Sequence, residues 1–369
     1  MPQKYYLPQT VFDGNEIRSG MAVAVNNGTI EALIPEQNLP AGAPVERLAG
    51  ALLAPSFIDL QIYGANKKLL AVHPSPDALH DLYAYCLAGG APLFQPTVAT
   101  NTSDVFYKAI DAVRNYQNSG GKGIIGLHVE GPWISMTKRG AHLPECVHPP
   151  TVEEARELLE RGKGIITMIT LAPEVCSPEV IELVQSYGVV VSAGHSNATF
   201  EEANRAFDDL NIPVATHMFN AMSALQHRGP GLAGALMLHP HAMASIIPDG
   251  HHVDYAAIRI AKKLMGSRLF AITDAVTETS EGGYQHQLVG DKYESNGILS
   301  GSALTMHAAF RNLVQHAGVD MAEALRMCSL YPARVMKMDD RYGKIQPGYA
   351  ASFVVLRENG ELVKTIVPE

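Results

Sequence analysis

The sequence has few cysteines and no excess of basic residues. Its four cysteines, Cys86, Cys146, Cys176 and Cys328, lie far apart and form no C-x-x-C pair. Neither a disulfide framework nor a thiolate zinc site is therefore expected, which fits a reducing cytoplasm as the location. The 28 Lys and Arg residues against 37 Asp and Glu give a formal charge of −9. That balance argues against nucleic acid as a partner.

Long apolar runs are missing as well. The opening residues, MPQKYYLPQTVFDGNEIR, lack the apolar stretch of a signal peptide, and the run 231–247 is interrupted by His239, Pro240 and His241. We therefore expect no membrane segment. With 369 residues, of which 47% are hydrophobic, the chain is expected to bury a sizeable core. The length suits about two domains, or one large α/β barrel with an appendage.

Both ends of the chain show strand signals. Residues 1–50 contain short strand-like runs with a hairpin turn at Asn26-Asn27-Gly28, and residues 336–369 return to short strands after the segment GKIQPG. We expect the two ends to pair with each other. They would form one small, discontinuous β-sandwich domain beside a central domain at 51–335.

The central region alternates apolar runs with amphipathic helices, the pattern of βα units. Ser75-Pro76 is expected to begin one helix, and two capping boxes, Thr151 with Glu154 and Thr199 with Glu202, begin two more. Most of the apolar runs lack polar alternation, as strands buried on both faces do. The runs lie at 57–60, 94–97, 123–130, 164–171, 188–195, 213–217, 244–248 and 269–274. Eight such strands close a (β/α)8 barrel, so the predicted fold is an α/β TIM-type barrel.

Four titratable residues stand at the carboxyl ends of these runs: Glu130, His195, His217 and Asp274. Barrel enzymes build their sites at that edge. A single histidine at a strand end is more often a hydrogen-bonded core residue, but the joint occurrence favours a site. One Glu and two His form the three-ligand set typical of a catalytic divalent metal, for which Zn, Fe, Co and Mn all qualify. Asp274 would then be free to act as general acid and base.

Three loops carry further candidates. His142 follows Glu130 by twelve residues and is a candidate to polarise a substrate carbonyl. Arg228 lies beside a glycine-rich segment and can bind an oxyanion with two hydrogen bonds. The segment 249–252, Asp-Gly-His-His, offers ring N–H donors to hydroxyls or phosphate. No metal is expected at its two histidines, because adjacent side chains on an extended segment diverge.

Seven motifs occur in order along the chain, followed by the ending GKIQPGYAASFVVL: HVEGPW, SAGHSNAT, THMFNAM, PGLAGA, DGHHVD, ITDAV and SGSALTM. Together they resemble the N-acetylglucosamine-6-phosphate deacetylase family of the amidohydrolase superfamily. The resemblance covers essentially the whole chain, from LLAPSFIDL to the tail. It implies a metal-bearing (β/α)8 barrel with a small β-sandwich from both chain ends. It also implies a cytoplasmic homodimer that acts on an amino-sugar phosphate.

The same resemblance implies roles for individual residues. Glu130, His195 and His217 match the metal ligands, Asp274 the general acid/base, and His142 the contact to the amide carbonyl. The implied substrate contacts are Ala141, Asn220, Ala221, His252, Leu304, Thr305 and Met306, of which Ala141 and 304–306 act through the backbone. Arg228 matches a phosphate ligand that the partner subunit donates. The dimer is therefore expected to be needed for full activity.

The sequence departs from the superfamily pattern after the first barrel strand. Gln61-Ile62-Tyr63 stands where an H-x-H motif is usual. Neither Gln61 nor Tyr63 is a strong ligand for a zinc-type ion at neutral pH, so we expect one metal ion per subunit, not two. The pair remains a candidate second-site or water-holding pair. Tyr63 stands where Asn is more familiar, and we expect it to alter the water network or the acyl pocket.

The expected reaction is the hydrolysis of the 2-acetamido group of N-acetylglucosamine 6-phosphate to glucosamine 6-phosphate and acetate. The nearest alternative is the same reaction on the galactosamine epimer or on another acetamido-sugar phosphate. A cyclic-amide hydrolase is disfavoured, because that group carries the H-x-H pair and a strand-end lysine that this sequence lacks. A catalytically inactive, metal-poor scaffold is supported only by the missing H-x-H motif. Metal content would separate this scaffold from the enzymes.

Overall fold

The computed structural model describes residues 4–295 and 297–368. The chain divides into two compact units. One is built from the chain up to Asp59, Cys86–Leu93 and the chain from Thr305, and the other from Leu60–Tyr85 and Phe94–Leu304.

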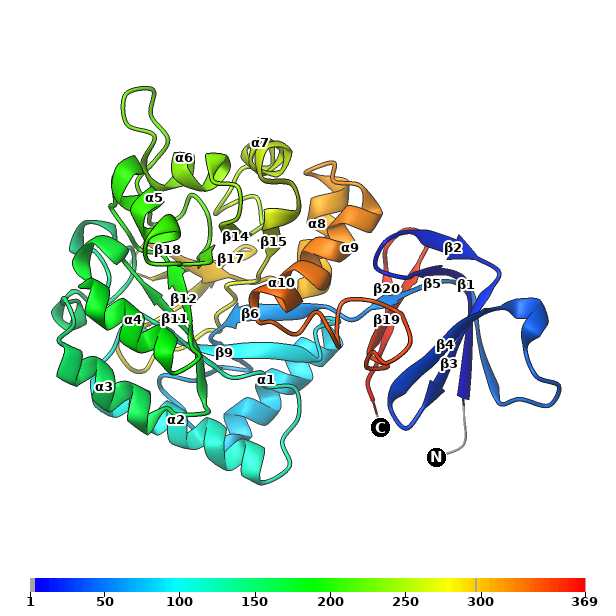
Figure 1. The fold of residues 1–369 in the computed structure, drawn as a ribbon. Coiled ribbons are helices and arrows are strands. Elements are labelled where there is room, and N and C mark those ends of the chain that lie inside the picture. Colours follow the sequence, from blue (N-terminus) through cyan, green and yellow to red (C-terminus); the bar gives the residue numbers. More distant parts are fainter. Residues whose placement is uncertain (1–3, 296, 369) are drawn as a thin grey trace. The chain divides into compact units, whose positions relative to one another are not determined.

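The central sheet is a parallel barrel of eight strands (Figure 1). Around the barrel the order is β6 (Ile58–Ile62), β9 (Leu93–Ala99), β10 (Leu127–Glu130), β11 (Ile166–Leu171), β12 (Val190–Ala193), β13 (Val214–Ala215), β14 (Met243–Ile246) and β15 (Leu269–Ala271). The circle closes where Ile62 forms a parallel bridge with Ala275, and the Asp274 N–H donates to the Gln61 carbonyl at 2.9 Å. The (β/α)8 barrel predicted from the eight apolar runs is confirmed. Strands such as β6 and β10 are buried along their whole length, as their unbroken apolar character requires.

Ten helices lie among the described residues, most of them outside the barrel strands (Figure 1). They are α1 (Pro76–Ala88), α2 (Ser103–Asn118), α3 (Val152–Arg161), α4 (Pro178–Ser186), α5 (Phe200–Asp208), α6 (Gly231–Leu238), α7 (Tyr255–Met265), α8 (Met306–Gln315), α9 (Met321–Cys328) and α10 (Leu330–Val335). Short 3-10 turns lie at Glu36–Asn38, Met136–Lys138, Pro144–Cys146, Pro173–Val175 and Gly266–Arg268. No helix within the described ranges is long and apolar enough to cross a membrane.

The two predicted capping boxes differ in outcome. At α5 the box is complete, since the Thr199 side chain accepts from the Glu202 N–H and the Glu202 carboxylate accepts from the Thr199 N–H. At α3 the Thr151 side chain accepts from the Glu154 N–H, but the Glu154 carboxylate instead accepts from the Trp133 indole and contacts His148. The prediction of a reciprocal box at α3 was wrong, because tertiary partners occupy its carboxylate.

Two small antiparallel sheets lie in the connections of the barrel. The hairpin of β7 (Gly64–Ala65) and β8 (Lys68–Leu69) follows β6. A three-stranded sheet of β16 (Gln287–Val289), β17 (Lys292–Ser295) and β18 (Ile298–Ser302) lies between β15 and α8. The sequence analysis predicted no strands there, because these strands are short and largely exposed or half-buried.

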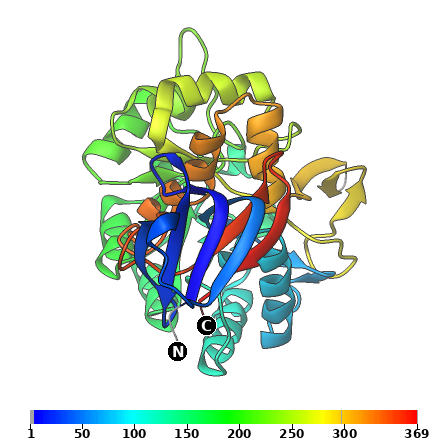
Figure 2. The same cartoon turned by 90° about the vertical axis from the view of Figure 1, so that its right-hand side faces the viewer.

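The two chain ends share one sheet of seven strands (Figure 2). Its order is β20 (Leu362–Ile366), β19 (Phe353–Arg357), β5 (Val45–Pro55), β1 (Lys4–Phe12), β3 (Met21–Asn26) and β4 (Thr29–Pro35), with β2 (Ile17–Ser19) paired to β1. Strand β19 pairs antiparallel with β5, so the expected association of the ends in a strand-rich domain is confirmed. Buried side chains from both ends, among them Val11, Leu53, Ile345 and Phe353, form one apolar cluster.

Candidate active site

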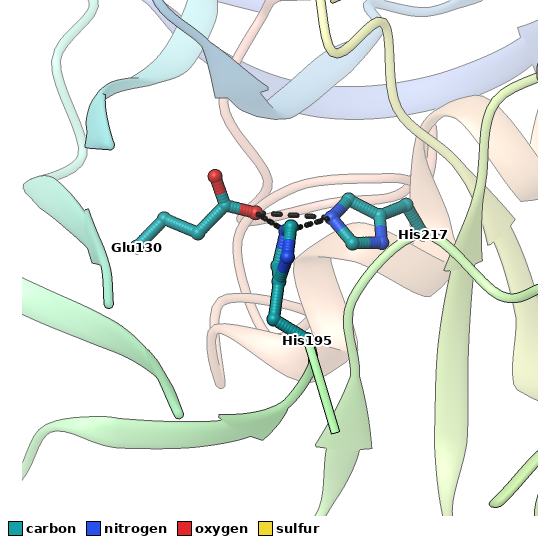
Figure 3. Close-up of side chains that lie close together, drawn as sticks. All are labelled: Glu130, His195 and His217. Atoms are coloured by element: carbon teal, nitrogen blue, oxygen red, sulfur yellow. Dashed lines mark hydrogen bonds and ion pairs between the residues drawn. The ribbon is translucent and has the colours of Figure 1, made fainter. Parts of the chain in front are cut away.

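Three side chains from the carboxyl ends of barrel strands converge on one point (Figure 3). Glu130 is the last residue of β10, His195 follows β12 and His217 follows β13. The His217 Nε2 lies 3.0 Å from Glu130 Oε1 and 3.2 Å from His195 Nε2. The His195 Nε2 lies 3.3 Å from the same carboxylate oxygen. All three side chains are at most 5% exposed, so the barrel holds this cluster out of bulk water.

The backbone at the candidate residues adopts a conformation that side-chain-bearing residues rarely take. The φ angles are +47° at His195, +34° at His217 and +54° at Asp274, all in the left-handed region. Surrounding hydrogen bonds keep the backbone in this unfavourable conformation. The His217 N–H, for example, donates to Ser245 Oγ at 2.7 Å. Strained residues of this kind gather at functional sites, where the surrounding fold compensates their cost.

The donor chemistry of the cluster fits a divalent cation. The His195 Nδ1 lies 2.9 Å from the Lys138 carbonyl, which can only accept. The proton therefore sits on Nδ1, and Nε2 turns its lone pair toward Glu130 and His217. The His217 Nδ1 is buried and finds no hydrogen-bond partner within the described residues. Two imidazole nitrogens and one carboxylate oxygen are a common zinc-type ligand set.

The charge states in the cluster suit cation binding. Burial lowers the pKa of His217, so its ring is neutral, as a ligand must be. Burial alone would raise the pKa of Glu130, but the close contacts with His142, His195 and His217 outweigh it and hold the pKa well below the usual range. The site thus presents one negative charge and neutral nitrogen donors.

Gln61 and Tyr63 form a second layer around Glu130. The Tyr63 hydroxyl donates to Glu130 Oε2 at 2.5 Å, and the Gln61 amide donates to the Tyr63 oxygen at 2.7 Å and to Glu130 Oε1 at 3.0 Å. The Tyr63 oxygen also lies 3.4 Å from Asp274 Oδ1. Burial and the charges of Glu130 and Asp274 raise the pKa of Tyr63, so this phenol remains a proton donor.

His142 faces Glu130 from the loop after β10. Its Nε2 lies 3.3 Å from Glu130 Oε2, and its Nδ1 lies 2.6 Å from the Thr100 hydroxyl. The Tyr284 hydroxyl donates to the Thr100 carbonyl at 2.6 Å and lies 3.5 Å from the Leu143 N–H, so it links Thr100 to the loop that carries His142. Burial, with a smaller effect from His195, lowers the pKa of His142 to about 4. The ring is therefore neutral at neutral pH.

The cluster opens into a cavity of about 210 Å³. Ten residues singled out from the sequence line it: Tyr63, Glu130, Ala141, His142, His195, His217, Asn220, Ala221, His252 and Asp274. His252 is oriented by Asp249, whose carboxylate lies 2.6 Å from His252 Nδ1. Hydrogen bonds from His252 outweigh burial and lower the pKa of Asp249. Asp249 is thus an anionic anchor for the ring.

Sequence reasoning missed one wall of the cavity. Tyr284, His286 and the segment 299–301 line it from the region of the β16–β18 sheet, and Leu69, Ala71 and Ala99 add an apolar side. Leu69, Ala99 and Tyr284 are buried together, with Tyr63 packed against them. No sequence signal marked these residues, since their place depends on contacts such as that between Tyr284 and Thr100, 184 residues apart.

Four other predicted substrate contacts lie outside the residues that line this cavity. The Leu304 carbonyl accepts from the Tyr85 hydroxyl, Thr305 caps α8, and Met306 is its first, buried residue. Arg228 is exposed in a tight turn whose ends, Gln226 and Gly229, form a β-bridge. In Figure 1 the connection between β13 and α6, drawn in yellow-green, projects beyond these elements. The roles of these four residues remain predictions.

Comparisons with known proteins agree with the geometry. Residues 52–367 match the sequence model of the Amidohydrolase family. The chain is 33% identical to N-acetylglucosamine-6-phosphate deacetylase of Haemophilus influenzae, over 97% of this chain and 96% of that one. It is 31% identical to N-acetylgalactosamine-6-phosphate deacetylase of Escherichia coli O157:H7, over 90% and 89%. A crystal structure of N-acetylglucosamine-6-phosphate deacetylase from Pasteurella multocida is 31% identical, with a TM-score of 0.93 over 99% of this chain and 98% of that one. The chain belongs to the amidohydrolase family.

Proposed function

We propose that this protein hydrolyses the 2-acetamido group of N-acetylglucosamine 6-phosphate, with glucosamine 6-phosphate and acetate as products. The observation that carries the proposal is that one cavity is lined by a cation ligand set, a further carboxylate and a neutral histidine. The activity named for the Haemophilus influenzae and Pasteurella multocida relatives supports the same reaction.

Glu130, His195 and His217 would hold one divalent cation, Zn²⁺ first and Fe²⁺, Co²⁺ or Mn²⁺ as alternatives. When bound, the cation supplies Lewis-acid polarisation of the amide carbonyl and lowers the pKa of a water molecule. Gln61 and Tyr63 are engaged with Glu130, which supports one cation per subunit and not two.

Asp274 is the proposed general acid/base. Its carboxylate lines the same cavity as the cation ligands, on the loop that closes the barrel. It would take one proton from the attacking water as the new C–O bond forms. It would then return that proton to the sugar nitrogen as the C–N bond breaks, so that the amine leaves neutral and the acyl group leaves as acetic acid, whose remaining water-derived proton passes to the amine to give acetate and ammonium.

His142 is the proposed donor to the carbonyl oxygen. Because its ring is neutral, it can donate from only one nitrogen. Its Nε2 faces the Glu130 carboxylate, which can only accept, so we place the proton on Nε2 and leave Nδ1 to accept from the Thr100 hydroxyl. This N–H would stabilise the negative charge that develops on the carbonyl oxygen.

The sugar and its phosphate would be bound on the β13–β14 side of the barrel. Asn220, Ala221 and His252 line the cavity there and are the proposed sugar contacts, with Ala141 from the β10 loop. We assign the backbone of Leu304, Thr305 and Met306 to further substrate contacts. The proposed phosphate ligand is the partner subunit's Arg228, which requires a homodimer; the exposed, projecting turn supports this role. Four free cysteines support a cytoplasmic location.

The galactosamine epimer is the second candidate substrate. It is favoured by the Escherichia coli O157:H7 relative, whose identity to this chain, 31%, is close to that of the glucosamine enzymes. The two sugars differ at one hydroxyl, so a single hydrogen-bonding residue can decide between them.

Acetate release from the purified, cation-loaded protein tests the proposal. We expect fast release from N-acetylglucosamine 6-phosphate and much slower release from unphosphorylated N-acetylglucosamine, because the phosphate supplies binding energy that orients the amide. Faster release from N-acetylgalactosamine 6-phosphate would select the epimer instead. No release from any of the three sugars would contradict the proposal, and if no cation were bound either, it would favour a catalytically inactive scaffold.

A further inference from the structure

The two oxygens of the Glu130 carboxylate have different surroundings. Oε1 faces His195 and His217 at 3.3 and 3.0 Å. Oε2 accepts from the Tyr63 hydroxyl at 2.5 Å and lies 3.3 Å from His142 Nε2. A carboxylate can bind a cation through one oxygen or through both. Oε1 also accepts from the Gln61 amide at 3.0 Å, so both oxygens have a donor, but only Oε1 faces the two histidines and only Oε2 is held by the phenol.

Tyr63 is held so that its hydroxyl cannot easily leave Oε2. Its N–H donates to the Ala275 carbonyl and its own carbonyl accepts from the Leu70 N–H, both at 2.9 Å. The Gln61 amide donates to its oxygen at 2.7 Å, which leaves the phenol proton for Glu130. The ring packs against the buried cluster of Leu69, Ala99 and Tyr284. Backbone, side chain and packing therefore all fix the direction of this O–H bond.

We propose that Tyr63 is a positioning residue that reserves Oε2 of Glu130, so that this glutamate offers only Oε1 to the cation. The inference rests on the cation site of the proposed function. It gives the tyrosine a role different from that of a cation ligand. Without the phenol proton, a buried carboxylate oxygen would lose its shortest hydrogen bond. Oε2 would then keep only the longer contact with His142 at 3.3 Å, and the carboxylate would be free to rotate out of the position that aims Oε1 at the cation.

The competing explanation is that Tyr63 only fills space beside the cavity. A ring of the same shape without the hydroxyl would then serve equally well. The two explanations differ in what they predict for cation binding, which can be measured without any substrate.

The test is Tyr63→Phe, which removes one oxygen atom and keeps the ring. The metal-free protein would be reconstituted with Co²⁺, its affinity measured by chelator competition and its coordination followed by the visible spectrum. Loss of a group that orients a ligand typically costs about 10- to 100-fold in metal affinity. We expect a loss of that size together with an altered Co²⁺ spectrum. Melting temperatures would verify that both proteins are folded.

Tyr116→Phe is the matched control. Tyr116 is a buried tyrosine whose hydroxyl donates to the Lys122 carbonyl at 2.8 Å, and it is not among the residues that line the cavity. Removal of the Tyr116 hydroxyl should leave the Co²⁺ affinity and spectrum unchanged. If Tyr63→Phe did not fold, Tyr63→Met would replace it, since it also removes the hydroxyl and keeps a long apolar side chain; weaker binding is expected again.

The possible outcomes distinguish a failure of the cation site from a failure of the role proposed for Tyr63. If the parent protein bound no cation, the cation site and the proposed function would fail together. If the parent bound one Co²⁺ and Tyr63→Phe bound it with the same affinity and spectrum, only the positioning role would be overturned. A weaker, spectrally altered complex in Tyr63→Phe but not in Tyr116→Phe would establish it.

Discussion

The cation cluster and the turn that carries Arg228 belong to one proposed reaction, yet their surroundings are opposite. Glu130, His195 and His217 are at most 5% exposed, and each has contacts from several barrel loops. Arg228 is exposed, and within the described residues it makes no hydrogen bond or ion pair. One chain therefore assembles the chemical centre by itself, whereas the proposed phosphate ligand, Arg228, is not among the residues that line that chain's cavity.

The largest expected effect is at the enclosed centre. Asp274→Asn should keep one equivalent of cation and lose about 10²- to 10⁴-fold in kcat, because a general acid/base contributes that much. Acetate release and metal analysis on the same sample would measure both. Turnover close to that of the parent protein would remove Asp274 from the mechanism.

His142→Gln probes the donor to the carbonyl oxygen. Removing one such donor typically costs about 10²- to 10³-fold in kcat, with little change in KM. Thr100→Val should reproduce part of this loss, since the Thr100 hydroxyl lies 2.6 Å from His142 Nδ1. Steady-state kinetics of the two variants would check the prediction. An effect on KM alone would assign His142 to substrate binding.

Arg228→Ala should act on binding at the exposed turn. We expect KM for the phosphorylated sugar to rise about 10- to 100-fold, the loss typical of a hydrogen bond to a charged group. The unphosphorylated sugar should be unaffected. His227→Ala, in the same exposed turn, is the control.

Mixing Arg228→Ala with Asp274→Asn tests whether the arginine comes from a second subunit. A hybrid dimer would contain one site with both an intact Asp274 and the partner subunit's Arg228, so activity at substrate concentrations well below the raised KM should exceed that of either variant. No gain on mixing, with hybrid dimers shown to form, would place the contribution of Arg228 within its own chain.

The smallest effect concerns the missed wall of the cavity. Burial lowers the pKa of His286 from about 6.5 to about 4. The unfolded chain therefore binds a proton more readily than the folded one, and the free energy of unfolding should fall as pH drops from 6.5 toward 4, by about 2 kcal/mol from this residue at pH 5. The free energy of unfolding, measured by urea unfolding across this range, should change less with pH in His286→Gln than in the parent protein. An unchanged slope would mean that His286 titrates normally in the folded protein.

The barrel and its central residues were predictable because their signals are local. An apolar run ending in Glu or His marks a strand and a side chain at the carboxyl edge, and a parallel barrel brings all such edges together. Strand lengths were less predictable. The run 123–130 forms a strand only from Leu127, since Gly123 and Gly126 have φ of +87° and +133°. A Cβ at Gly126 would also meet the Thr167 side chain at 2.0 Å.

The rest of the site depends on contacts that no local pattern records. Tyr63 and Asp274 are 211 residues apart, and Tyr284 reaches Thr100 from a segment without apolar periodicity. Residues 299–301 line the cavity in the same connection that carries the predicted contacts at 304–306, and no sequence pattern singled them out. Which residues of one connection reach the cavity depends on how the β16–β18 sheet folds, not on the motif that marks the connection.

The most direct test of the central claim is a titration of metal-free protein with Zn²⁺ while acetate release from N-acetylglucosamine 6-phosphate is followed. We expect no activity without the ion, a linear rise of activity with added Zn²⁺, and a plateau at one equivalent per chain. Full activity in the metal-free protein, or a plateau at two equivalents, would contradict a single cation held by Glu130, His195 and His217.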